Sequence, residues 1–113
     1  MQNNQINYIE LPATDIGQTK EFYQSAFGWK FIDYGPDYVA ISEAGLDGGF
    51  YKTTEPIYNG ALIILYHSDL KEVQEKVIAA GGHISKDIFT FPGGKRFHFT
   101  DPSGNELAVW SDQ

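Results

Sequence analysis

The chain has 113 residues, enough for one average domain and too few for two with separate hydrophobic cores. Apolar residues make up 42% and aromatic residues 15%, which excludes an intrinsically disordered chain. Only 8 basic residues stand against 15 acidic ones, and a net charge of −7 argues against nucleic acid or an anionic membrane as partner. The chain has no cysteine, no signal-peptide pattern and no apolar run long enough to span a bilayer, so we expect a cytoplasmic protein.

The first half of the chain predicts a strand followed by a helix. Residues Ile6–Leu11 have the composition of a strand, and the next apolar residues recur three and four positions apart over Ile16–Phe27. Thr14 or Asp15 is the expected N-cap of this helix, and Gly28 the expected left-handed C-cap. The helix therefore packs one face against a core.

The second half repeats this pattern. Residues Ala61–Tyr66 again predict a strand, Ser68 or Asp69 an N-cap, and Gly81-Gly82 the end of a helix. An offset of 54 residues places Asp15 on Asp69 and Leu11 on Leu65. Such a regular offset indicates two copies of one structural motif.

Each predicted helix is followed by three short segments of alternating polarity, separated by glycine- and proline-containing turns. These segments are Lys30–Tyr34, Tyr38–Ser42 and Leu46–Lys52, then His83–Phe89, Lys95–Thr100 and Glu106–Trp110. The sequence thus predicts an α+β domain over residues 1–113, made of two β-α-β-β-β modules at 1–53 and 60–113. Residues 53–59 are the linker between the modules.

One helix covers only one face of a four-stranded sheet, so each module leaves a helix-free face. Two such faces curved toward each other form a cup-shaped sheet that encloses a cleft, and we expect function to lie there. The alternative is that the open faces form a subunit interface. The two interpretations, a ligand cleft and a subunit interface, are compatible in a homodimer.

If Tyr8 of the first strand faces the cleft, strand alternation places Glu10 on the same face. A carboxylate on an otherwise apolar strand is unusual. Glu10 is either the partner of a cationic ligand or a general base, or it forms an ion pair with a lysine or with Arg96.

The last two strands contribute a second set of cleft residues. Alternation in Lys95–Thr100 places Arg96 and His98 opposite the phenylalanines that face the helix. His98 is either an acid-base group or a hydrogen-bonded structural residue. In the last strand the same face carries Glu106, Ala108 and Trp110, and Trp110 is either a stacking wall for a ligand or a residue that closes the sheet edge or a dimer seam.

Two stretches resemble the vicinal oxygen chelate superfamily of glyoxalases, bleomycin-resistance proteins and extradiol dioxygenases. The first is Ile9-Glu10-Leu11-Pro12-Ala13-Thr14-Asp15 with the following Phe22-Tyr23 and Phe27-Gly28-Trp29. The second is Phe97-His98-Phe99-Thr100-Asp101-Pro102-Ser103-Gly104-Asn105-Glu106-Leu107, which is similar to the closing hairpin of that family. The resemblance covers the whole chain and implies the same cup-shaped fold.

Metal-dependent members of this family bind a divalent ion through one ligand on the first and one on the last strand of each module. The corresponding positions here are Tyr8, the stretch Gly48 to Phe50, Leu62 and Ala108. These side chains do not form a metal site, so we expect neither a metal nor another cofactor. A displaced set of Glu10, Glu106 and His98 is the alternative.

The resemblance therefore implies a metal-independent protein of the glyoxalase and bleomycin-resistance type that binds a small organic molecule, as a homodimer. The residues expected to line the ligand are Tyr8, Phe50, Leu62, Arg96, Glu106, Ala108 and Trp110. The alternative is an enzyme of the lyase, isomerase or dioxygenase type. In that case Glu10 and His98 share acid-base work on a small carbonyl or hydroxy compound.

Overall fold

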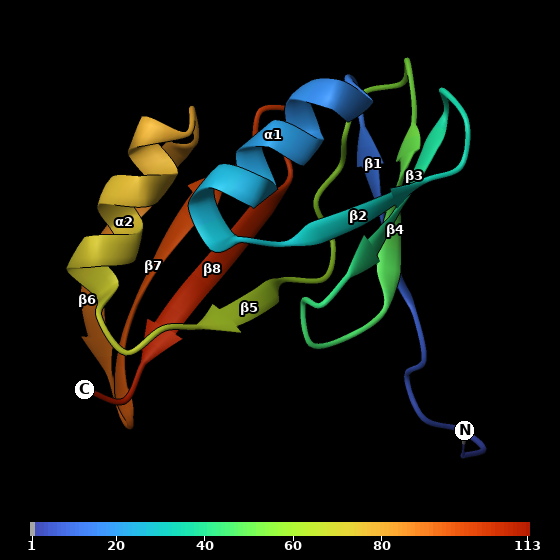
Figure 1. Ribbon diagram of the computed structural model, residues 1–113. Helices are drawn as coiled ribbons and strands as arrows, with labels where there is room; N and C mark the ends of the chain where they lie inside the picture. The colour runs from blue at the N-terminus through green and yellow to red at the C-terminus, as the bar shows by residue number, and fades with distance from the viewer. Residues whose placement is uncertain (1) are drawn as a thin grey trace.

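The computed structural model describes residues 2–113, which form two β-α-β-β-β modules (Figure 1). The first module contains β1 (Ile9–Ala13), α1 (Ile16–Phe27), β2 (Lys30–Asp33), β3 (Tyr38–Ser42) and β4 (Gly48–Lys52). The second contains β5 (Ile63–Tyr66), α2 (Leu70–Ala79), β6 (His83–Phe91), β7 (Gly94–Thr100) and β8 (Glu106–Ser111). The predicted fold class is confirmed.

The strands form two mixed sheets with the same topology. Sheet A has the order β1-β4-β3-β2 and sheet B the order β5-β8-β7-β6, with the first strand of each module parallel to the last. Strand β1 continues through Pro12 to Ala13, so the expected end at Leu11 is wrong. Proline is tolerated here because β1 is an edge strand, where one side of the backbone needs no ladder partner.

Both helices begin at the predicted aspartates. The Asp15 carboxylate accepts a hydrogen bond from the Gln18 amide at 2.9 Å, and Asp69 accepts one from the Glu72 amide at 3.1 Å. Helix α1 ends at Gly28 with φ of 71°, as predicted. Helix α2 ends earlier than the repeat implies, because the left-handed residue is Gly81 with φ of 101°.

One hydrophobic core joins the two modules. The helices lie side by side, with α2 in front of sheet B (Figure 1). Phe22 of α1 contacts Phe99 of sheet B at a ring centroid distance of 5.9 Å, while Tyr23 of α1 contacts Phe50 of sheet A at 5.2 Å. Helix α1 therefore packs against both sheets. No helix among residues 2–113 is long and apolar enough to cross a bilayer.

The turn between β7 and β8 is organised by the buried carboxylate of Asp101, which is 4% exposed. Its Oδ1 atom accepts hydrogen bonds from three consecutive backbone amides, those of Ser103, Gly104 and Asn105, at 2.9 to 3.0 Å. Its Oδ2 atom accepts from the Tyr23 hydroxyl at 2.9 Å and from the Asn105 side-chain amide at 3.0 Å. The turn is therefore structural, and it also attaches α1 to the second module.

Replacing Asp101 tests this attachment. Asp101→Ala leaves the buried Tyr23 hydroxyl and the Asn105 amide without their acceptor, so we expect the free energy of unfolding to fall by about 3 kcal/mol or more. Urea denaturation measures the change. Asp37→Ala is the matched control, because Asp37 lies in an exposed turn. A loss for Asp101→Ala within about 0.5 kcal/mol, the usual range of a surface substitution, contradicts the assignment.

Candidate functional site

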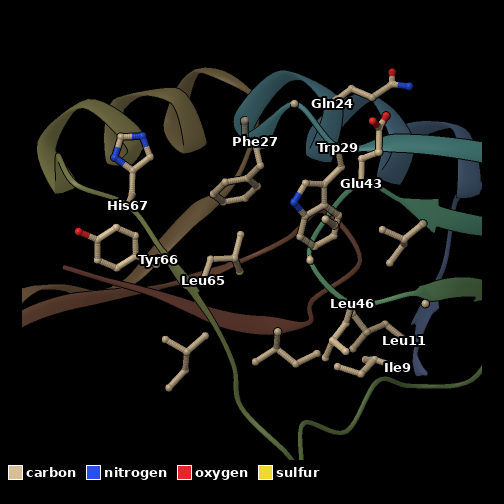
Figure 2. A pocket seen from close by; sticks show the side chains of 18 of the residues that line it. Ile9, Leu11, Gln24, Phe27, Trp29, Glu43, Leu46, Leu65, Tyr66 and His67 are labelled. Atoms are coloured by element: carbon tan, nitrogen blue, oxygen red, sulfur yellow. The ribbon is translucent and has the colours of Figure 1, made fainter. Parts of the chain in front are cut away.

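The largest pocket described lies between the two modules and has a volume of about 790 Å³ (Figure 2). Ile9 and Leu11 of β1 form one wall, Leu65 of β5 another, and Phe27 and Trp29 lie at the end of α1. Leu11, Leu65, Phe27 and Trp29 are also packed against the core. The pocket therefore adjoins the core at the edges of both sheets and extends past β5 to Ile64 and Tyr66. None of the residues expected to bind a ligand lines it.

Four expected ligand residues, Arg96, Glu106, Ala108 and Trp110, share the helix-free face of sheet B. Phe97, Phe99, Leu107 and Val109 belong to the core, so the residues that alternate with them point the other way. The strand register places Arg96 opposite Trp110, His98 opposite Ala108, and Thr100 opposite Glu106. The sequence analysis predicted this grouping.

Aromatic rings surround Arg96 on this face. The guanidinium carbon lies 5.4 Å from the ring centroid of Phe89 and 5.6 Å from that of Phe91, within the range of cation–π attraction. The Trp110 ring is 6.5 Å from Phe91 and 5.3 Å from Tyr66. We call this set the sheet B face; its members are Tyr66, Phe89, Phe91, Arg96, His98, Glu106 and Trp110.

His98 is 5% exposed, and neither of its ring nitrogens has a hydrogen-bond partner among the described residues. Its Nδ1 atom lies 3.5 Å from Oε2 of Glu106, and that oxygen accepts a hydrogen bond from the Ser85 hydroxyl at 3.0 Å. Burial lowers the pKa of His98, because a charged imidazole loses hydration there. The nearby Arg96 and Lys86 lower the pKa further, whereas Glu106 opposes them. The imidazole is therefore held neutral.

The helix-free face of sheet A carries a chain of hydrogen bonds that ends at Glu10. The Tyr38 hydroxyl donates to Oε2 of Glu10 at 2.9 Å, so Tyr8, whose hydroxyl lies 2.6 Å away, donates to Tyr38. Burial, followed by these hydrogen bonds, raises the pKa of Tyr38 well above its usual value. Gly49 permits this arrangement, since a Cβ atom there would collide with the Tyr38 hydroxyl.

The structure corrects three expectations about single residues. Phe50 has no exposed surface and belongs to the core, because its side of β4 is the one that faces α1. Ala108 lies on the sheet B face but is also fully buried, so it offers no surface to a ligand. Glu10 is exposed, and its side-chain partner is Tyr38 rather than a lysine or Arg96. Leu62 lies just before β5 and is partly buried.

The residues present do not fit the metal site of metal-dependent relatives. Tyr8 hydrogen-bonds to Tyr38, Phe50 is in the core, and Ala108 has no donor atom. Over residues 2–113, no three side chains of His, Cys, Asp or Glu come close enough together to hold a metal ion. The displaced set of Glu10, Glu106 and His98 is divided between the two sheets.

Several residues of the two faces were missed by the sequence analysis. Tyr38, Tyr66, Phe89 and Phe91 all have side chains that contact predicted site residues. Phe89 and Phe91 alternate along β6, which was a signal for a common face. Alternation alone does not predict which face this is, because the register of β6 against β7 shifts between Ile84 and Phe89.

Comparison with known proteins identifies the family. Residues 5–109 match the model of the Glyoxalase/Bleomycin resistance protein/Dioxygenase superfamily, and the chain belongs to this family. It is similar to a "Glyoxylase-like domain-containing protein" of Didymella fabae, with 31% identity over 95% of this chain and 93% of that protein. It is also similar to the "Putative glyoxylase CFP32" of Mycobacterium tuberculosis, with 28% identity over 92% of this chain.

The chain spans 44% of the length of that mycobacterial protein. Among solved structures, it resembles a glyoxalase/bleomycin resistance protein/dioxygenase family enzyme from Burkholderia phytofirmans PsJN. The TM-score is 0.83 at 18% identity, over 95% of this chain and 98% of that one. At this identity the likeness establishes the fold alone.

The buried neutral imidazole of His98 predicts a pH dependence of stability. Because its pKa is lower in the folded than in the unfolded chain, the unfolded chain binds the proton more tightly. The free energy of unfolding should therefore decrease as the pH falls below about 6.5, the ordinary imidazole value. Urea denaturation between pH 8 and pH 5 measures this slope, and His98→Gln should flatten it. The exposed His83 is the matched control, since His83→Gln leaves the buried ring in place; equal slopes in His98→Gln and the parent chain contradict the prediction.

Proposed function

We propose that this protein binds a small organic molecule on the sheet B face without the help of a divalent metal. The observation that carries the proposal is the His98 side chain, which is 5% exposed and whose ring nitrogens form no hydrogen bond with residues 2–113. Buried polar atoms nearly always have a hydrogen-bond partner in native proteins. Nδ1 is directed at Glu106, so a ligand removes this deficit by hydrogen-bonding to Nε2 once the side chains that cover this nitrogen move aside.

The surroundings of His98 support a binding role. Ligand sites combine apolar walls with a few polar groups that fix orientation. Here Trp110 and Tyr66 supply aromatic surface, and Tyr66 is 51% exposed. Arg96 and His98 supply the polar groups.

The homodimer expected from the family resemblance is the second part of the proposal. Strands β1 and β5 are the edge strands of their sheets, and the pocket of Figure 2 lies between them. Two apolar side chains of this pocket, Leu46 and Ile64, are 48% and 45% exposed. Contact with a second copy buries this apolar surface. The cytoplasmic location likewise stays a prediction.

The alternative function is an enzyme that uses Glu10 and His98 together. Within one chain these residues lie in different sheets, and each is associated with a residue of its own sheet, Tyr38 and Glu106 respectively. Shared acid-base chemistry therefore requires that sheet A of one copy faces sheet B of another. No observation within the single chain favours this alternative over binding alone.

A thermal-shift screen of metabolites and antibiotics tests the binding proposal. A ligand at about one hundred times its dissociation constant adds about 2.7 kcal/mol, which raises the Tm by roughly 10 °C for a domain of this size. We expect the shift to persist in excess chelator and to disappear in His98→Phe. Elemental analysis of protein purified without chelator gives the opposing outcome. About one equivalent of zinc, nickel, iron or manganese, lost on His98→Ala or Glu10→Ala, contradicts metal independence.

The dimer is tested by two matched substitutions. Ile64→Glu places a charge in the pocket between β1 and β5, and we expect it to shift the protein from a dimer to the monomer mass of 12.7 kDa. Ile78→Glu is the control, because Ile78 is 56% exposed and lies on α2 outside the pocket. Sedimentation velocity measures both. A monomeric parent protein, or dissociation by both variants alike, argues against this interface.

A further inference from the structure

We infer that the molecule bound by the sheet B face is a small aromatic carboxylate whose anionic group pairs with Arg96. This inference rests on the proposed function, because it names the class of ligand for the same site. It goes further in assigning opposite ends of the face to different parts of the ligand.

Arg96 is the only arginine among the 113 residues, and it has no acidic partner in the described part of the chain. Of the seven lysines, three pair with carboxylates: Lys20 with Asp33, Lys30 with Glu43, and Lys76 with Glu72. The Nδ1 atom of His98 lies 3.5 Å from Oε2 of Glu106, but this contact is not an ion pair because the imidazole is neutral. In a chain with a net charge of −7, an arginine without a carboxylate partner on a candidate binding face is notable.

The guanidinium of Arg96 is held in position by aromatic rings rather than by an acid. Phe89 and Phe91 lie 5.4 and 5.6 Å from its central carbon. Its Nε atom is buried and has no hydrogen-bond acceptor within the part of the chain that the structure describes. A guanidinium binds carboxylates through two parallel N–H donors, and removal of water strengthens that pairing. The missing acceptor at Nε therefore matches an oxyanion of the ligand.

The residues beside Arg96 specify the rest of the ligand. Trp110 is directly opposite Arg96 on the neighbouring strand and has Tyr66 at 5.3 Å, which suits a planar apolar body. His98 is two residues further along β7, a separation of roughly 7 Å in a strand. A single ring with a carboxylate at one end and a hydroxyl or carbonyl at the other spans this distance.

The acidic group of the face does not oppose an anion at Arg96. Glu106 is four residues from Trp110 along β8, roughly 13 Å in a strand. Its carboxylate is associated with the Ser85 hydroxyl and with His98. The charge of Glu106 thus lies at the His98 end of the face. At the other end, beside Trp110, the Asp112 carboxylate accepts a hydrogen bond from the Tyr66 hydroxyl at 2.6 Å, so this acid is engaged by Tyr66 rather than by Arg96.

The test measures the nuclear magnetic resonance signal of the single arginine side chain. In a proton–nitrogen correlation spectrum the chain has one arginine Nε–H resonance, and it belongs to Arg96. Three probes of similar shape and different charge are titrated: benzoate, benzamide and benzylamine. We expect benzoate to shift the Arg96 resonance and the Trp110 indole resonance, and to bind at least about tenfold more tightly than the other two.

Variants separate the charge of Arg96 from charge in general. Arg96→Gln should weaken benzoate binding at least about tenfold. Lys95→Gln, which removes the same charge from the opposite side of β7, should leave it within about twofold. The comparison of probes on the parent protein remains decisive if Arg96→Gln fails to fold.

Two results would overturn the inference. If benzamide or benzylamine binds as tightly as benzoate and shifts Trp110, the ligand is not an anion, while the proposed function stands. If benzoate leaves the Arg96 resonance unchanged, the assignment of Arg96 as the anion partner is wrong. The proposed function is decided separately, by the effect of His98→Phe on molecules found in the thermal-shift screen.

Discussion

The hydrogen bonds of the Asp101 carboxylate are the constraint on which the arrangement of the two modules depends. This one side chain holds the turn before β8 and accepts a hydrogen bond from Tyr23 of the first module. Asn105, fixed by the same carboxylate, donates to the backbone carbonyl of Pro12 at 2.8 Å and so connects β8 to β1. Because α1 is positioned in this way, its rings reach Phe50 on one side and Phe99 on the other.

This shared core explains why the two helix-free faces have distinct chemistry. Both helices cover the inner sides of the sheets, so the outer side chains do not belong to the hydrophobic core that joins the modules. Sheet A uses its outer side for the hydrogen-bonded chain from Tyr8 through Tyr38 to Glu10. Sheet B uses it for an arginine, a neutral buried histidine and aromatic rings, a combination suited to an aromatic anion.

The two halves of the chain thus share a fold and differ in the side chains on their outer faces. The same topology places Glu10 beside Gly49 in sheet A and Ile64 beside Ala108 in sheet B. The glycine makes room for Tyr38, whereas Ala108 is buried and lies opposite His98. A duplicated framework therefore carries one polar face and one aromatic face, because the outward positions are free to vary without disturbing the interior.

The sequence by itself determined the modules, the start of both helices and the grouping of Arg96, His98 and Trp110. These features follow from local patterns: helix capping by Asp15 and Asp69, and the alternation of side chains along a strand. Only the tertiary structure decided that Phe50 is internal, that Tyr38 rather than Arg96 is the partner of Glu10, and that Phe89 and Phe91 enclose Arg96. Each of these features depends on the packing or pairing of segments that are separate in the sequence. In β6 the faces are set by register shifts, which the periodicity of a strand does not encode.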